Sequence, residues 1–469
     1  MKDLKLISLL KTFSKTEIKK FEKFLQSPYL NTSGEYIFKF FNSIKKYYPE
    51  FESAELTKQN IFKKIYPKEK YNDARMRKLT SETMKFLLDY LGVKSFLKDE
   101  QSKGHYILKE LKNRNADSLF ELKSKEQLRN LEKNKIKDYH YYGEKHKLTE
   151  LIKSFYFNRE RKKAIPLFDE EMQQLSKYFS LLFIHKFIER YMEKRSFTDA
   201  DFYLPYFKEI INFAEENYSG KENLFDLYYT ELLLHINGDE KYYFSLKHLK
   251  DKLSDKIHKN SSSLIYFTLT NYATEQFEKG RLNYLNELFN LHKEILKRKL
   301  YDNIFSEFLY MNIVTVALRL DETKFAEKFI TEYKNKIKKD VREDTYNYTL
   351  ANIYFSKKEF SSALETLSKI NFSFSLHKFL IKNLTLKIYY ELNETNSIYS
   401  LIDSFKHTIK RDKSVPENVK ALVTNYTNFV KELVRIKQGE KNKEDIEARI
   451  KKETTAEKSW LLSKAKEFK

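Results

Sequence analysis

Apolar residues recur along most of this chain at intervals of three and four, the spacing that lines one face of an α-helix. The clearest example is residues 345–370, in which two apolar rows flank a short polar turn at residues 357–359. The rows are formed by Leu350, Ala351 and Tyr354, and then by Phe360, Ala363, Leu367 and Ile370. This pattern predicts two short helices joined by a tight turn, with alanines where the helices approach most closely.

The same rhythm predicts further helix pairs between residues 166 and 435. We expect them at 222–236 with 242–257, 262–278 with 282–297, 303–319 with 323–337, and 376–391 with 397–410. Three pairs align on one register, with repeats about 37–41 residues apart. The corresponding positions are Ala273, Gly280, Leu285 and Phe289; Ala317, Asp321, Ala326 and Ile330; and Tyr354, Lys358, Ala363 and Leu367.

Five further segments accompany the helix pairs. Amphipathic stretches predict an N-terminal helical domain, then a hinge and a charged helical connector, and finally a closing helix and a charged C-terminal helix. Their expected bounds are 1–98 for the domain, 99–104 for the hinge, 105–161 for the connector, Pro416 to about 435 for the closing helix and 440–469 for the last helix.

Side-chain caps mark several helix starts in the N-terminal domain. Ser14 and Glu17 form a capping box, in which the serine oxygen accepts the Glu17 amide and the glutamate reaches back. Ser33 and Thr57 are expected to begin the third and fourth helices, and Asn72 or the residue after it the fifth.

Composition supports an all-α chain. Only 8 Gly and 6 Pro occur in 469 residues, which leaves little room for the turns of an all-β protein. The absence of cysteine excludes thiol nucleophiles, disulfides and thiolate metal sites. The N-terminus lacks a signal-peptide pattern, and no apolar run approaches the ~18 residues of a membrane span, so we expect a cytoplasmic protein.

The net charge of +21 is unevenly placed along the chain. The basic excess lies in residues 1–200 and 401–469, whereas acidic and basic residues balance in 201–400. A basic front is typical of contact with nucleic acid or an anionic surface. A solvated lysine-rich surface, on which lysines alternate with glutamates at helical spacing, accounts for the same residues.

No arrangement for catalysis or cofactor binding is visible. Phosphate loops need glycines close together, but the nearest pair here is Gly92 and Gly104. His140 and His146, six residues apart, lie on different helix faces and so lack the spacing of a zinc-binding helix. With no organised Ser/His/Asp set either, the sequence predicts no enzyme, no cofactor and no metal.

The helix pairs of residues 262–410 resemble tetratricopeptide repeats, although these units are longer than the usual 34 residues. The resemblance implies an α-solenoid of tetratricopeptide-like helix pairs over residues 166–435. Three phrases also resemble an uncharacterised family of bacterial helical-repeat proteins, a likeness that brings no activity or ligand with it. They are FEKFLQSPYLN (21–31), MNIVTVALRL (311–320) and LKIYYELNE (386–394).

Residues 56–90 support a different interpretation. LTKQNIFKKIYP, KEKYND and ARMRKLTSETMKFLLDYL resemble the helix–turn–helix core of a winged-helix regulator. That resemblance implies that the second helix enters the major groove with Arg75, Arg77, Lys78 and Lys85 toward DNA. The chain departs from the pattern because it stays helical after Leu91, where a winged helix needs a β-hairpin. A helical bundle with a basic outer face accounts for the same residues.

The favoured function is a non-catalytic interaction scaffold that binds a protein or peptide on the concave face of stacked helix pairs. Polar residues expected on that face are Asn271, Thr274, Asn312, Thr315, Arg319, Tyr348, Thr349 and Asn352. The alternative is a nucleic-acid-binding regulator that uses the basic N-terminal domain. A third interpretation is self-association through incomplete end repeats. Trp460, the only tryptophan, is a candidate anchor either for a partner or for the array itself.

Overall fold

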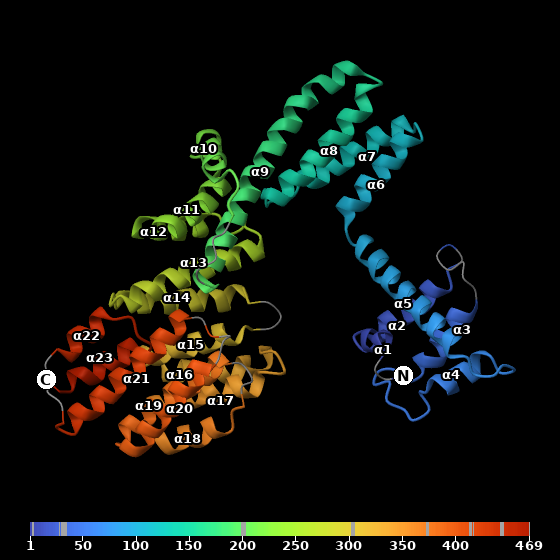
Figure 1. The fold of residues 1–469 in the computed structure, drawn as a ribbon. Coiled ribbons are helices and arrows are strands. Elements are labelled where there is room, and N and C mark those ends of the chain that lie inside the picture. The colour runs from blue at the N-terminus through green and yellow to red at the C-terminus, as the bar shows by residue number, and fades with distance from the viewer. Residues whose placement is uncertain are drawn as a thin grey trace. The chain divides into compact units, whose positions relative to one another are not determined.

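The computed structural model describes residues 1, 4–27, 29, 35–197, 203–301, 305–371, 375–411, 415, 417–440 and 445–468 (Figure 1). Within these ranges the chain forms 23 α-helices and one short 3-10 helix, and no strand. The predicted all-α class is therefore confirmed. The cap expected at Ser33 and the helix start at Pro416 lie outside the described residues.

The chain divides into two compact units. The first comprises residues 1–133 and 147–169, and the second comprises residues 134–146 and 170–469. The first unit begins with five helices: α1 (Lys5–Leu10), α2 (Lys15–Leu25), α3 (Glu35–Lys45), α4 (Lys58–Ile65) and α5 (Asp73–Phe96).

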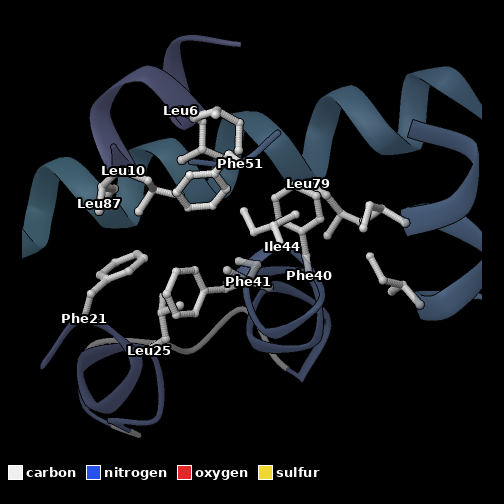
Figure 2. Packing of buried hydrophobic residues seen from close by; sticks show 14 of the residues in the cluster. Leu6, Leu10, Phe21, Leu25, Phe40, Phe41, Ile44, Phe51, Leu79 and Leu87 are labelled. Carbon is white, nitrogen blue, oxygen red and sulfur yellow. The ribbon is translucent and has the colours of Figure 1, made fainter. Parts of the chain in front are cut away.

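A continuous apolar core holds α1 to α5 together (Figure 2). The rings of Phe21 and Phe41 meet edge to face with centroids 4.9 Å apart, in the geometry that aromatic pairs prefer. The predicted caps are present: Ser14 and Glu17 form the capping box, Thr57 caps α4, and the Asn72 side chain accepts the Arg75 amide at 3.0 Å.

Three further helices follow: α6 (Glu100–Asn113), α7 (Asp117–Glu132) and α8 (Tyr139–Phe157). The expectation of a hinge at 99–104 was wrong, because Asp99 caps α6 by accepting the Ser102 amide at 3.0 Å, and residues 100–104 are helical. Gly104 is buried against α7, where an added Cβ atom would lie 2.3 Å from the amide at the end of the flexible Gln127 side chain.

Helix pairs dominate the second unit, after α9 (Arg161–Phe197) and α10 (Phe207–Tyr218). All five predicted pairs are present as helices. They are α11 (Asn223–Asn237) with α12 (Glu240–Lys252), α13 (Lys259–Glu278) with α14 (Asn283–Arg298), α15 (Glu307–Arg319) with α16 (Thr323–Tyr333), α17 (Arg342–Ser356) with α18 (Phe360–Ser368), and α19 (Ser375–Glu391) with α20 (Thr395–Arg411).

Four of these pairs share one turn geometry. Each first helix ends with a residue in the left-handed region, and the next residue donates its N–H to the carbonyl five positions back, which is a Schellman motif. The left-handed residues are Gly280, Asp321, Lys358 and Asn393, and the accepting carbonyls belong to Gln276, Ala317, Tyr354 and Tyr389.

This geometry corrects the sequence alignment at one position. Gly280, Asp321 and Lys358 do correspond, as expected. However, the equivalent of Ala317 and Tyr354 is Gln276, not Ala273, which lies three residues too early. The displacement is about one helical turn and is confined to this position, because Leu285 and Phe289 keep the common spacing from the turn.

Second helices of successive pairs also pack in register. Tyr243 of α12 donates to Glu287 of α14 at 3.3 Å, and Lys250 donates to Glu294 at 2.7 Å. Tyr284 donates back to Glu240 at 2.6 Å. All three hydrogen bonds join residues 44 positions apart, so α12 and α14 lie parallel with matched turns.

The chain ends in α21 (Glu417–Lys437), α22 (Ile446–Lys452) and α23 (Lys458–Lys466). We expected one charged helix in this tail, but two short ones form. Glu453 has an extended backbone, with ψ 151°, and Glu457 has φ 53°, so neither can continue a helix.

Adjacent leucines on α5 provide a test of the N-terminal core. Leu87 is fully buried whereas Leu88 is exposed. Leu87→Ala should lower the free energy of unfolding by about 2–5 kcal/mol, because it removes buried methyl groups and leaves a cavity. Leu88→Ala should change it by less than about 0.5 kcal/mol. Urea denaturation followed by circular dichroism measures both, and equal losses would contradict the packing of α5.

Candidate functional site

The shared turns place a row of polar residues on successive first helices. Two positions before the accepting carbonyl, the residues are Thr274 on α13, Thr315 on α15, Asn352 on α17 and Lys387 on α19. We call these four residues the polar row. Because the position recurs in a common register, the four side chains leave their helices at equivalent angles.

The residues predicted for partner binding differ in exposure. Thr274, Asn312 and Arg319 are exposed, and Asn271, Thr315 and Asn352 are half-buried. Tyr348 and Thr349 are buried, so their side chains are used in packing and are not displayed on a surface.

Several polar groups of this set bond within their own helix. Thr315 donates its hydroxyl to the Met311 carbonyl at 2.9 Å, and Asn352 donates an amide hydrogen to the Tyr348 carbonyl at 2.8 Å. Arg319 instead reaches a neighbouring helix, with its guanidinium 5.2 Å from the centre of the Phe277 ring on α13. α13 and α15 are therefore in contact at the end of the row.

The C-terminal segment packs against α19 and α21. Ile446, Ile450, Leu461 and Ala465 are buried in one cluster with apolar residues of α19, α20 and α21. Between α22 and α23, the Ala456 amide donates to the Leu422 carbonyl at 3.2 Å, and Asn425 donates to the Thr454 carbonyl at 2.9 Å. We call residues 445–468 the C-terminal hairpin.

Two ion pairs join the C-terminal hairpin to α19. Lys387, a member of the polar row, pairs with Glu457, and their side chains are only 13% and 20% exposed. One turn further along α19, Glu391 pairs with Lys464 at 2.7 Å. Lys387 and Glu391 of α19 are thus each matched by an opposite charge on the hairpin.

The Glu457 carboxylate remains ionised in this setting. Burial opposes its ionisation, but the positive charges of Lys387 and Arg319 outweigh that effect, so the pKa of Glu457 lies below its usual range. The hairpin therefore presents a true anion to Lys387 and Arg319.

Trp460 lies between these two ion pairs. Its ring meets Tyr390 of α19 at 5.3 Å and Tyr426 of α21 at 6.3 Å, both nearly edge-on. Its indole N–H and the Tyr390 hydroxyl are buried without a hydrogen-bond partner. Each such orphaned group costs roughly 1–3 kcal/mol, so the apolar fit of the hairpin is better than its polar fit.

Lys387 and Glu391 were missed by the sequence interpretation. The sequence alignment of the helix pairs ended with the pair at 345–370, although the turn at Asn393 repeats the same geometry in the next pair. Extending it by one pair would have placed Lys387 in the same position as Asn352. Glu391 would have been found by the same step, because it corresponds to Arg319.

The basic residues considered for DNA binding are largely engaged within the first unit. Arg75 pairs with Glu69 at 2.5 Å and lies 3.8 Å above the Tyr66 ring, whereas Arg77 pairs with Asp73 at 3.0 Å. Lys78 approaches Glu82 at 3.9 Å, and Lys85 is exposed. The chain after α5 continues as α6, with no hairpin of strands among the described residues.

A buried polar cluster links α11 to α13. Thr268 donates to Glu231 at 2.8 Å, and His235 lies 3.1 Å from the same hydroxyl. Glu231 is 1% exposed, so this Glu/Thr/His set is closed to a substrate and joins two helices. Burial raises the pKa of Glu231 to about 8.

Other kinds of site were sought across the described ranges. No group of three or more side chains there could hold a metal ion. None of the described helices is both long and apolar enough to cross a membrane. An apolar pocket of about 290 Å³ lies between α9 and α10, lined by Phe179, Phe183, Ile210 and Phe213 among others.

Glu231 makes stability depend on pH. The folded chain keeps a proton up to about pH 8, whereas the unfolded chain releases it near 4.5, so stability falls as pH rises between these values. The glutamine of Glu231→Gln cannot ionise. The free energy of unfolding of this variant, relative to that of the wild type, should therefore rise by about 1 kcal/mol per pH unit in this window. Urea denaturation across the window measures this, with the exposed Glu216→Gln as control. Parallel pH curves for wild type and Glu231→Gln would contradict it.

Docking of the C-terminal hairpin can be followed through Trp460, the only tryptophan. Lys387→Glu should weaken docking by about 2–5 kcal/mol, since it places two carboxylates together, and tryptophan emission should shift to longer wavelength. Adding Glu457→Lys should restore the original emission. Lys378→Glu, at an exposed position of the same helix, should leave the emission unchanged. A failure of the double variant to recover would show that the pair does not hold the hairpin.

The resemblance to tetratricopeptide proteins rests on the residues quoted above, and it stays a prediction. Comparison of the chain with protein-family models, with curated proteins and with solved structures found no match.

Proposed function

We propose that residues 166–435 form a tetratricopeptide-like α-solenoid and that the chain is a non-catalytic scaffold. In this proposal, the first helices line a concave face that binds a protein or peptide partner. The observation that carries it is the polar row, which repeats at one register position over four consecutive helix pairs.

The repeated contacts support the solenoid. First helices α15, α17, α19 and α21 touch in succession, and the second helices α12 and α14 pack in register. Tyr426 of α21 donates a hydrogen bond to the Asn383 carbonyl of α19 at 3.1 Å, so the contacts between neighbouring helices extend to α21. Packing of each unit on the next is the arrangement expected of a solenoid.

Exposure of the polar side chains supports partner binding. Thr274, Asn312 and Arg319 are exposed on α13 and α15, although residues on the opposite sides of these helices are buried. Guanidinium and amide groups suit recognition of a peptide backbone or carboxylate. By contrast, the buried Glu/Thr/His cluster and the paired arginines of α5 favour structural roles.

The binding face can be tested by replacing Asn271, Thr274 and Asn312 together with alanine. These residues lie outside the apolar cluster and the ion pairs that hold the C-terminal hairpin. The amount of partner that co-purifies with the tagged full-length chain from its source cells should fall at least about tenfold. This corresponds to a loss of about 1.4 kcal/mol in binding free energy.

A matched control replaces Lys324, Lys328 and Ser361, which are exposed on the second helices α16 and α18. This variant should keep its partners, as judged by quantitative mass spectrometry. Equal retention by both variants would exclude the first-helix face as the binding surface.

A further inference from the structure

The C-terminal hairpin lies on the face that the polar row defines. We propose that it is an internal occupant of the partner site. The partner that displaces it is a helix with a carboxylate at its start, an aromatic ring three residues later and an ammonium four residues after that. This inference rests on the proposed function, because it names the chemistry of the partner that the scaffold binds.

The spacing of the contacts defines this chemistry. Trp460 and Lys464 are four residues apart on α23 and so lie on one side of it, and Glu457 is the N-cap residue directly before the helix. On α19, their partners Lys387, Tyr390 and Glu391 follow in the same order. A helix with a carboxylate at its N-cap, followed by these two groups, can therefore meet α19 with the same contacts in the same order.

The occupied surface continues into the rest of the polar row. Lys387 belongs to the row, and the charge of Arg319 on α15 acts on the Glu457 carboxylate across the intervening α17 position. A partner helix that replaces α23 would thus begin at the cationic end of the same face that carries Asn352 and Thr315. One continuous surface serves both the hairpin and the partner.

The docked hairpin leaves polar groups without hydrogen bonds that a partner helix can satisfy. The indole N–H of Trp460 and the hydroxyl of Tyr390 are buried without hydrogen bonds, at an interface whose ion pairs are otherwise well formed. A partner with an acceptor at this point would remove that penalty. The hairpin therefore covers the α19 part of the face without matching it fully.

The covalent link to the chain favours the hairpin over a free ligand of the same sequence. A covalently linked segment acts at an effective concentration in the millimolar range, so a free helix of the same sequence cannot compete with it at micromolar concentration. Weakening the hairpin's own contacts should open the face to the same sequence supplied as a separate peptide.

The test uses the full chain with Glu457→Gln and Trp460→Ala, which we call the opened variant, and a labelled peptide of residues 445–468. Fluorescence anisotropy should show binding to the opened variant at least tenfold tighter than to the wild type. The opened variant lacks tryptophan, so the emission of the peptide's Trp460 should shift to shorter wavelength on binding. Circular dichroism checks that the variant is folded.

Variant peptides test each chemical group. Peptides with Glu457→Lys, Trp460→Ala or Lys464→Glu should each bind the opened variant at least tenfold more weakly. Adding Lys387→Glu to the opened variant should abolish binding of the natural peptide and restore binding of the Glu457→Lys peptide. A merely structural role for these residues would not produce this exchange of specificity.

Three outcomes would overturn the inference. These are equal binding of the peptide to wild type and opened variant, no binding to a folded opened variant, and a stable dimer of the opened variant that excludes the peptide. Should the opened variant be unfolded, Glu457→Gln with Lys464→Ala serves in its place. If the peptide fails but replacement of Asn271, Thr274 and Asn312 still removes partners, the scaffold function stands and only its proposed ligand falls.

Discussion

The order of the helix pairs depends on a backbone constraint at four turns. Gly280, Asp321, Lys358 and Asn393 adopt left-handed angles, and the amide after each bonds to the carbonyl five residues back. For a residue with a Cβ atom this conformation costs about 1–2 kcal/mol, which the satisfied carbonyls and the packing beyond the turn must offset. Because the turn fixes where the first helix ends, it also fixes which of its residues face outward. The polar row is a consequence of that geometry.

The pattern of apolar residues was sufficient to predict the class, the helix pairs and most helix starts. It succeeded where local chemistry decides the outcome, as at Ser14 and Asn72, whose side chains cap the helices that follow them. It failed at residues 99–104 because a polar composition with a glycine suggested a hinge. There the Asp99 side chain caps a helix that runs through the glycine, and Gly104 is buried beside Gln127 of α7, a neighbour that the local composition does not reveal.

The candidate site was predicted only in part, for a related reason. Exposed positions such as Asn312 follow from the helical period, but Thr349 is buried by neighbours that the period does not reveal. Lys387 and Glu391 look like ordinary surface charges in sequence, since a lysine and a glutamate four apart commonly pair with each other. Their real partners, Glu457 and Lys464, lie in the hairpin about 70 residues away, and only the fold brings them together.

A scaffold whose binding face is partly covered by its own C-terminal segment binds only those partners that can displace that segment. The docked hairpin is held by two largely buried ion pairs and an aromatic cluster, yet it carries unsatisfied polar groups at its centre. Buried ion pairs add little net stability once desolvation is counted, but they strongly penalise a mismatched charge. The two ion pairs therefore contribute more to the selection of which helix binds than to the stability of the docked hairpin. Helices with the wrong order of charges are rejected by α19, whereas one with the right order must also bind tightly enough to offset the tethering of the hairpin.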